Sequence, residues 1–307
     1  MAKRRARGRD VSGILLLDKP AGISSNAALQ RVKRLFFAKK AGHTGSLDPI
    51  ATGLLPICLG EATKVSAYLL DADKGYRVTV KLGQQTATGD CEGEVIETRP
   101  VPNLTPADVE AVLAQLRGEI EQVPPMYSAL KKEGRPLYEL ARQGIEVERQ
   151  ARRVTIHALA LLALRGDEMD LEVHCSKGTY IRTLAEAIGE RLGCGAHVQQ
   201  LRRTRTGGFD LAQAITLETL EGLRDEGPAE GLDPYLLPMD SALQAWPDVS
   251  LTRDMVYYLR HGQAVLVPRA PTQGLVKLYG NHDEFLGIGH ILDDGRVAPK
   301  RLIAVVE

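Results

Sequence analysis

The sequence has few cysteines and no long apolar run. No CxxC pair and no Cys/His cluster of zinc spacing is present. No stretch approaches the roughly 18 apolar residues of a membrane-spanning helix. The apolar residues 13–17 follow a basic start, but the run is too short for a signal peptide and Asp18 interrupts it. These absences predict a cytoplasmic protein with reduced thiols, no metal site and no membrane partner. The four cysteines are Cys58, Cys91, Cys175 and Cys194.

The sequence also has no excess of charge of either sign, because 39 Lys and Arg residues balance 39 Asp and Glu residues. The charges are unevenly distributed, however. Residues 1–40 hold eleven basic residues and a net charge of +9, whereas residues 210–240 have a net charge of −7. This asymmetry is typical of a molecule with one basic and one acidic face, and nucleic acid is the natural partner of the basic face. A solvated tail and a solvated acidic helix explain the charges equally well.

The length and composition predict a soluble protein with one large and one small domain. The chain has 307 residues, of which 44% are apolar and 25% charged. Predicted strands and helices follow one another without a βαβ rhythm, which favours an α+β fold. Short apolar runs separated by glycine crowd the last sixty residues and predict a small β-barrel. We expect a large domain at 1–248 and a small one at 249–307, with 226–248 as a linker or surface excursion.

Local patterns predict several elements of the large domain. We expect strands at 14–17, 76–82, 171–175 and 197–209, and helices that begin near Ser24, Thr105 and Ile181. Two segments lack a clear period. Residues 41–57 are rich in glycine and are predicted to be mostly loop. Residues 124–153 hold seven basic and four acidic residues and are predicted to be a protruding basic loop with a short helix. The first ten residues are expected to be disordered.

Residues 42–56 contain the residue types that carry out chemistry. Two glycines allow a sharp turn, and His43 and Asp48 are types commonly used for proton transfer and nucleophilic attack. A phosphate-binding P-loop is excluded because no Lys-Ser/Thr pair follows the second glycine. A metal site lacks further ligands nearby. An aspartate before a proline is often only a turn former, and residue types alone favour that interpretation.

The whole segment, GHTGSLDPIATGLLP, resembles the central motif of the TruB family of bacterial tRNA pseudouridine synthases, which modify uridine 55 in the TΨC loop. Residues 13–26, 74–77, 175–191 and 196–210 resemble the other family motifs, in the same order. Segments FLGIGHI and PKRLI near the C-terminus are similar to a PUA domain, an RNA-binding barrel. The resemblance implies a pseudouridine synthase fold, in which helices flank a mixed, largely antiparallel sheet, followed by a PUA-like barrel.

The resemblance also implies roles for single residues. Asp48 matches the catalytic nucleophile, Arg182 the arginine that pairs with it, and Asp90 an acid associated with that arginine. Substrate-contacting positions match His43, Tyr76, Tyr180 and Leu201. The sequence pattern alone would place the last three in ordinary core packing.

The reaction that the resemblance implies suits a carboxylate and needs no cofactor. Breaking a glycosidic bond develops positive charge at C1′, which a carboxylate can stabilise. Attack at C1′, attack at C6 and removal of a C2′ proton all remain open. We expect a monomer that binds the T arm of tRNA without a guide RNA. Its phosphate contacts are expected in the basic loop and the small domain and at Arg202, Arg203 and Arg205.

Two other functions remain open from the sequence. An RNA-binding or RNA-folding protein without chemistry would not need Asp48. A guide-RNA-dependent relative of the family would carry longer and more basic extensions than this chain has.

Overall fold

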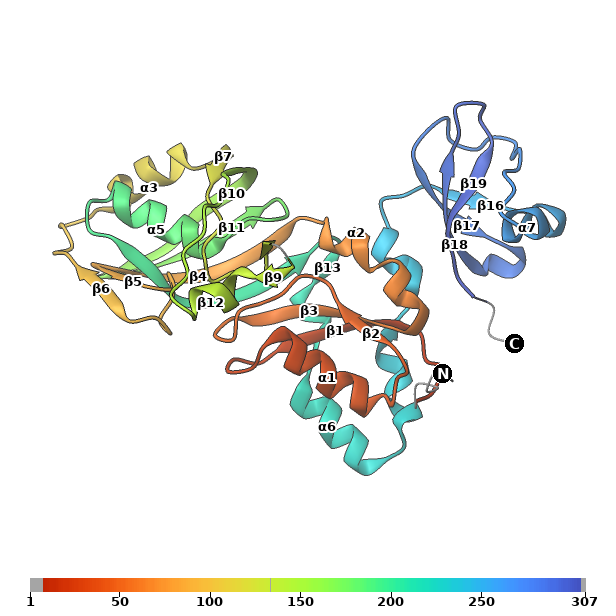
Figure 1. The fold of residues 1–307 in the computed structure, drawn as a ribbon, viewed down its shortest axis with the longest axis horizontal. Helices are drawn as coiled ribbons and strands as arrows, with labels where there is room; N and C mark the ends of the chain where they lie inside the picture. The colour runs from red at the N-terminus through yellow and green to blue at the C-terminus, as the bar shows by residue number, and fades with distance from the viewer. Residues whose placement is uncertain (1–7, 133, 305–307) are drawn as a thin grey trace.

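The computed structural model describes residues 8–132 and 134–304, which form one large mixed sheet with helices and a separate C-terminal sheet (Figure 1). The main strands are, in spatial order, β14 (Ile215–Thr216), β1 (Gly13–Lys19), β3 (Thr52–Leu59), β12 (Ala196–Thr206), β4 (Lys74–Leu82), β11 (Glu168–Cys175), β10 (Arg152–Arg165) and β7 (Gly118–Gln122). Three short strands outside this order, β2 (Ala41–His43), β13 (Phe209–Asp210) and β15 (Leu236–Leu237), pair with β3, β12 and β1.

Most neighbouring strands of the main sheet are antiparallel, as predicted. The pairs β1–β14 and β3–β12 are parallel, and the pairs from β12 through β4, β11 and β10 to β7 are antiparallel. Two small hairpins lie outside this sheet, β5 (Gln84–Thr86) with β6 (Val95–Thr98), and β8 (Lys131–Lys132) with β9 (Arg135–Pro136). The mixed sheet with helices confirms the predicted α+β class.

The helices begin where the sequence signals place them. The Ser24 hydroxyl accepts a hydrogen bond from the Ala27 N–H, and Thr105 and Asp108 form a capping box with Pro106 in the first turn. The α-helices are α1 (Ser25–Leu35), α2 (Ser66–Leu70), α3 (Pro106–Gln115), α4 (Leu137–Ala141), α5 (Ile181–Arg191), α6 (Leu217–Glu226) and α7 (Arg253–Arg260). The 3-10 helices are η1 (Gly60–Lys64), η2 (Leu211–Gln213), η3 (Ala229–Tyr235), η4 (Met239–Leu243) and η5 (Asn281–Asp283).

The two faces of the main sheet are covered differently. On one face, which we call the helix face, Leu15 and Tyr76 join an apolar cluster with the buried side chains of α1, α3, α5 and α6. On the opposite face, the reverse face, Ile14 joins a second cluster with α2, η4 and Ile288 of the C-terminal sheet. Arg77 is exposed, and strand alternation directs it to the reverse face. The C-terminal sheet thus contacts the reverse-face cluster through Ile288 and lies to one side of the main sheet (Figure 1).

The segment 41–57 differs from the prediction because it contains two strands. β2 and the first part of β3 lie in it, and the irregular backbone is confined to residues 44–51. β3 is buried on both faces, since Leu54 and Leu55 are each fully buried. A strand that is apolar on both faces shows no alternation, so its period could not be recognised in the sequence.

The segment 226–248 is packed onto the large domain, so the linker alternative was wrong and the surface excursion is the one that remains. Leu232 and Leu243 are buried in the two apolar clusters, and β15 pairs with β1. The Arg9 side chain donates a 2.8 Å hydrogen bond to the Asp233 carboxylate, so Arg9 contacts the acidic segment. Arg9 is thus held in place, whereas residues 1–7 lie outside the described residues.

The described C-terminal residues form an open sheet rather than the predicted closed barrel. The strand order is β16 (Asp248–Ser250), β17 (Leu275–Tyr279), β18 (Phe285–Ile291) and β19 (Val297–Leu302), and the two end strands do not pair with each other. One of the short apolar runs, residues 264–267, forms only an isolated bridge between Val265 and Val297. Among the described residues, this run therefore adds no full strand to the sheet.

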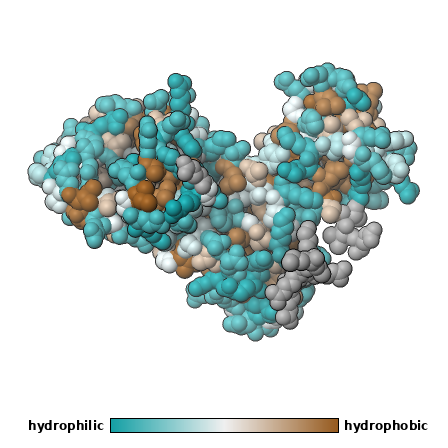
Figure 2. Space-filling model, in the orientation of Figure 1, coloured by the Kyte–Doolittle hydropathy of each residue, from teal (hydrophilic) through white to brown (hydrophobic). Residues whose placement is uncertain are grey.

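The molecule has a mainly hydrophilic surface in the view of Figure 2, where apolar side chains form separate patches rather than one band. Within residues 8–132 and 134–304, no helix has the length and apolar character needed to span a membrane.

Candidate active site

Asp48 lies in the irregular segment between β2 and β3. Residues of the motif at 13–26 hold this segment in place. The Leu47 N–H donates a 2.7 Å hydrogen bond to the Ser25 hydroxyl, and the Gly22 N–H donates one of 2.9 Å to the Pro49 carbonyl. The backbone is thus fixed on both sides of Asp48. This explains why residues near the start of α1 belong to the same site as residues 42–56.

Lys19 is a site residue that the sequence analysis did not single out. Its side chain is fully buried at the end of β1, and its ammonium group donates to the backbone carbonyls of Pro20 and Ile23, at 2.8 Å each. Burial lowers the pKa of Lys19 to about 8, and the charge of Asp48 opposes that change. The signal available in the sequence was a lysine two residues after an apolar run, inside a segment that resembles a family motif.

The structure brings Asp48, Arg182 and Asp90 together from three distant segments. The Arg182 Nε lies 3.0 Å from Asp48 Oδ2, and its Nη1 lies 3.4 Å from Asp90 Oδ2. The Arg182 and Asp90 side chains are only 6% and 4% exposed, whereas the Asp48 side chain is 38% exposed. Of the two carboxylates, Asp48 is therefore the one that a substrate can reach.

The remaining donors of Arg182 fix the orientation of its guanidinium. Nη1 donates to the Thr88 carbonyl at 2.8 Å, and Nη2 donates to the Tyr127 carbonyl at 2.6 Å. Arg182 occupies the first turn of α5, directly after Tyr180 and Ile181. A guanidinium whose three nitrogens are all engaged presents Nε to Asp48 in one orientation.

The pKa of Asp48 reflects opposing effects. Burial raises it above its ordinary value, Arg182 lowers it, Asp90 raises it and Lys19 lowers it. The net direction is upward, so burial outweighs the nearby cations. The Asp48 charge in turn raises the pKa of both Tyr76 and Tyr180, although burial is the largest cause in each case. The two tyrosines therefore lie in the electrostatic surroundings of Asp48.

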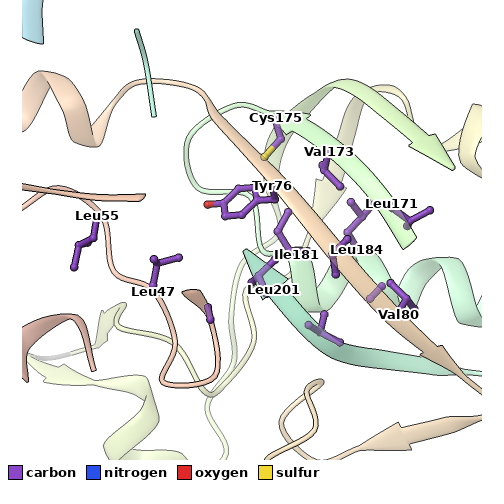
Figure 3. Packing of buried hydrophobic residues seen from close by; sticks show 14 of the residues in the cluster. Leu47, Leu55, Tyr76, Val80, Leu171, Val173, Cys175, Ile181, Leu184 and Leu201 are labelled. Atoms are coloured by element: carbon purple, nitrogen blue, oxygen red, sulfur yellow. The ribbon is translucent and has the colours of Figure 1, made fainter. Parts of the chain in front are cut away.

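The expected substrate-contacting residues come from β2, β4 and β12 and from Tyr180, the residue that precedes α5. Tyr76 on β4 and Leu201 on β12 are buried in the same cluster as Leu47, the neighbour of Asp48 (Figure 3). His43 ends β2, and its buried Nδ1 has no hydrogen-bond partner within the described residues. Burial, and to a smaller extent the charge of Arg203, lowers the pKa of His43. The imidazole is therefore neutral at neutral pH, which suits packing against a base.

The three arginines that were expected to bind phosphate are not on one surface. Arg203 is only 1% exposed on the helix face, so the expectation that it contacts phosphate is wrong. Arg202 and Arg205 line a separate groove together with Arg77 on the reverse face. Arg202 also pairs with Asp18, with Nη2 2.6 Å from the carboxylate. A register shift between residues 203 and 205 places Arg205 beside Arg202 rather than beside Arg203.

No group of three or more His, Cys, Asp or Glu side chains in residues 8–132 and 134–304 is arranged to hold a metal ion. The arrangement in the site is instead one accessible carboxylate supported by a buried arginine, next to two tyrosines and a leucine. Such a site can stabilise positive charge or attack carbon beside a stacked planar ring.

Family models match most of the chain. The model for the TruB family pseudouridylate synthase (N terminal domain) matches residues 33–181. The tRNA pseudouridylate synthase B C-terminal domain matches residues 182–244, and the model for Pseudouridine synthase II TruB, C-terminal, matches residues 247–303.

Solved structures with the same fold include a Cbf5-Nop10-Gar1 complex. This chain is 26% identical to the matched protein there, with a TM-score of 0.70, over 96% of this chain and 84% of the other. An H/ACA RNP bound to a substrate RNA containing 2′-deoxyuridine matches with a TM-score of 0.72 at 24% identity, over 95% and 85% of the two chains. The second similarity shows the fold alone.

Curated relatives are similar over nearly the full length. The chain is 59% identical over 303 residues to the tRNA pseudouridine synthase B of Stutzerimonas stutzeri (strain A1501), and the match covers 99% of each chain. It is 58% identical over 301 residues to the tRNA pseudouridine synthase B of Nitrosococcus oceani, covering 98% of this chain and 97% of the relative. The chain therefore belongs to the TruB family of pseudouridylate synthases.

Proposed function

We propose that this protein is a tRNA pseudouridine synthase that isomerises uridine 55 in the TΨC loop, with Asp48 as its catalytic nucleophile. The observation that carries the proposal is the contact of 3.0 Å between Asp48 and the buried Arg182, in a chain of the TruB family. An accessible carboxylate held in one orientation is the group that glycosidic bond cleavage requires.

The reaction exchanges one bond for another at C1′. The N1–C1′ bond breaks, the uracil turns, C5 forms a bond to C1′ and loses its proton, and N1 gains a proton. No atom is oxidised or reduced overall, so the reaction requires no cofactor. Asp48 can stabilise the charge at C1′, attack C1′, attack C6 of the ring or accept the C2′ proton. Each role requires the ionised carboxylate.

The target base must leave its stack to reach Asp48, because a base inside a folded RNA cannot present its glycosidic bond to a carboxylate held within the protein. Tyr76 would stack on the flipped uracil, a contact worth roughly 1–3 kcal/mol per base. Leu201 and Tyr180 would form the remaining walls of the pocket. His43, as a neutral side chain, would fill the space that the flipped nucleotide leaves or contact the neighbouring nucleotides.

The loop 124–153 would hold the RNA while Asp48 acts on it. Its β8–β9 hairpin carries three exposed basic side chains, Lys131, Lys132 and Arg135. The beginning of the loop contacts the site, since the Tyr127 carbonyl accepts a hydrogen bond from Arg182. Basic side chains that neutralise phosphates position the RNA without reading its sequence. The same role for the exposed Arg205 and the half-exposed Arg202 stays a prediction.

Replacing Lys131, Lys132 and Arg135 together by alanine is expected to weaken tRNA binding and make it less sensitive to salt. Each lost phosphate contact reduces the slope of log K against log salt by about 0.7–0.9. The KM for tRNA should rise while kcat stays close to that of wild type. Equilibrium binding at a series of salt concentrations measures the slope, and an unchanged slope would show that the hairpin does not contact phosphates.

We further propose that two domains of the chain have different roles. Residues 1–248 would form the catalytic domain, and residues 249–307 a PUA-like RNA-binding domain that contacts the same tRNA. The protein would act in the cytoplasm as a monomer without a guide RNA. The main alternative is a protein that binds or folds RNA without chemistry, and it predicts no change in the RNA.

An unmodified T-arm stem–loop tests the proposal. We expect the protein alone to convert its target uridine to pseudouridine, as mapped by mass spectrometry after chemical labelling. The same stem–loop with cytidine at that position should bind and give no product. Binding of the uridine stem–loop without any product would instead support the RNA-binding alternative or a requirement for a guide RNA.

A further inference from the structure

Arg203 is a buried cation that the proposed reaction does not yet use. Its Nε donates a 2.7 Å hydrogen bond to the Leu54 carbonyl, and its Nη2 donates one of 3.1 Å to the Gly45 carbonyl. Gly45 precedes Asp48 and Leu54 follows it, so the guanidinium spans the segment that carries Asp48. Arg203 therefore holds this segment from the side of β12.

The backbone is built to bring Arg203 close to this segment. β3 and β12 are parallel here, and Arg203 is aligned with Gly53. A Cβ at residue 53 would lie 2.3 Å from the Arg203 carbonyl oxygen, and Gly53 has a φ of +98°, so only glycine permits this approach. The position of Arg203 thus depends on the glycine at residue 53 of β3.

Arg203 also lies beside Tyr76. The two residues are aligned across the antiparallel pair β12–β4, which places their side chains on the same face and about 5 Å apart at Cβ. In Figure 3 the Tyr76 hydroxyl points toward Leu47 and Leu55, in the segment that Arg203 binds. Burial raises the pKa of this hydroxyl, and the nearby guanidinium lowers it.

The charge of Arg203 has a free-energy cost that packing alone does not explain. Both of its hydrogen bonds go to backbone carbonyls, and within the described ranges of the chain no carboxylate forms an ion pair with it. A buried cation without an anionic partner is unfavourable, and a neutral side chain of similar size would fill the space at lower cost. The charge is therefore expected to have a role in the site.

We propose that Arg203 is a positioning residue, which fixes the Tyr76 hydroxyl relative to the segment that carries Asp48. This inference rests on the proposed function, because it concerns the same reaction. When the N1–C1′ bond breaks, the electron pair stays on the uracil, and the base must then turn without leaving the pocket. A stacking residue held in register with the carboxylate keeps C5 within reach of C1′.

The test compares single-turnover rates of four variants with saturating enzyme. Arg203→Met should lower the rate about 10- to 100-fold with little change in tRNA affinity, because small displacements at a reacting centre have effects of that size. Arg203→Lys keeps the charge and should recover part of the loss. Arg165→Met is the control, since Arg165 is an exposed arginine of β10 that pairs with Asp170 at 2.7 Å, and it should retain the wild-type rate. Tyr76→Phe removes only the hydroxyl.

The double variant Arg203→Met with Tyr76→Phe shows whether Arg203 acts through Tyr76. If Arg203 acts through Tyr76, the double variant should lose less than the product of the two single losses. Independent losses that multiply would overturn the inference, as would a wild-type rate in Arg203→Met. If Arg203→Met does not fold, Arg203→Lys takes its place in the test. The loss of rate that Arg203→Lys causes should then be smaller in the Tyr76→Phe protein than in the wild type. Absence of product from wild type would instead overturn the proposed function itself.

Discussion

Asp48→Asn is expected to abolish pseudouridine formation while tRNA binding remains close to that of wild type. Asparagine has almost the same size and shape as aspartate, but it carries no charge and is a poor nucleophile. Removing a catalytic nucleophile typically lowers a rate by about 10³-fold or more. Binding depends mainly on phosphate contacts elsewhere on the surface, so it should change little.

Single-turnover kinetics and equilibrium binding together test this prediction. The matched control is Asp71→Asn, since Asp71 is an exposed carboxylate whose contact is an ion pair with Lys177 at 2.9 Å. The control should keep the wild-type rate. If Asp48→Asn formed product at a rate close to that of the control, Asp48 could not be the nucleophile.

Arg182→Met is expected to lower turnover about 100-fold or more and to change its dependence on pH. The side chain is 6% exposed and lies between Asp48 and Asp90. Removing one partner of a buried pair leaves uncompensated charge, which typically costs about 3–5 kcal/mol. Two carboxylates without their cation would favour protonation, so the reactive ionised form of Asp48 would become scarcer.

The sign of the pH effect follows from the pKa of Asp48. Burial already raises this pKa, and Arg182 opposes the rise. The wild-type rate should therefore fall as the pH falls through a raised pKa, and in Arg182→Met the fall should begin at a higher pH. The pH–rate profile of the two proteins measures this difference, with Arg182→Lys as the control that retains the charge. Identical acid limbs would mean that Arg182 does not keep Asp48 ionised.

The sequence predicted those parts of the fold that leave a local signal. Ser24 and Thr105 mark helix starts, and the alternation in β4 correctly placed Tyr76 on the apolar face. β3 was missed because it is buried on both faces. The sequence did not decide between a linker and a surface excursion for the acidic segment around Leu232, since its packing depends on contacts with distant strands that leave no local pattern.

The candidate site, like the fold, could be predicted only where the sequence leaves a local signal. Arg182 and Asp90 reach Asp48 only through the tertiary fold, so the resemblance to a family, and not the spacing of residues, connected them. The directions of Arg202, Arg203 and Arg205 could not be read from alternation, because the register shift in β12 changes which side chains share a face. A buried arginine that bonds to carbonyls has no distinctive sequence signal, and Arg203 was therefore assigned to phosphate.

The central claim is that this chain, without any partner, isomerises one uridine of tRNA. The most direct measurement is to incubate the purified protein with a full-length unmodified tRNA transcript and map every pseudouridine by mass spectrometry. We predict one pseudouridine per tRNA, in the T loop at position 55, formed over many turnovers. Tight binding of the transcript with no pseudouridine, or pseudouridine only at other positions, would contradict the account.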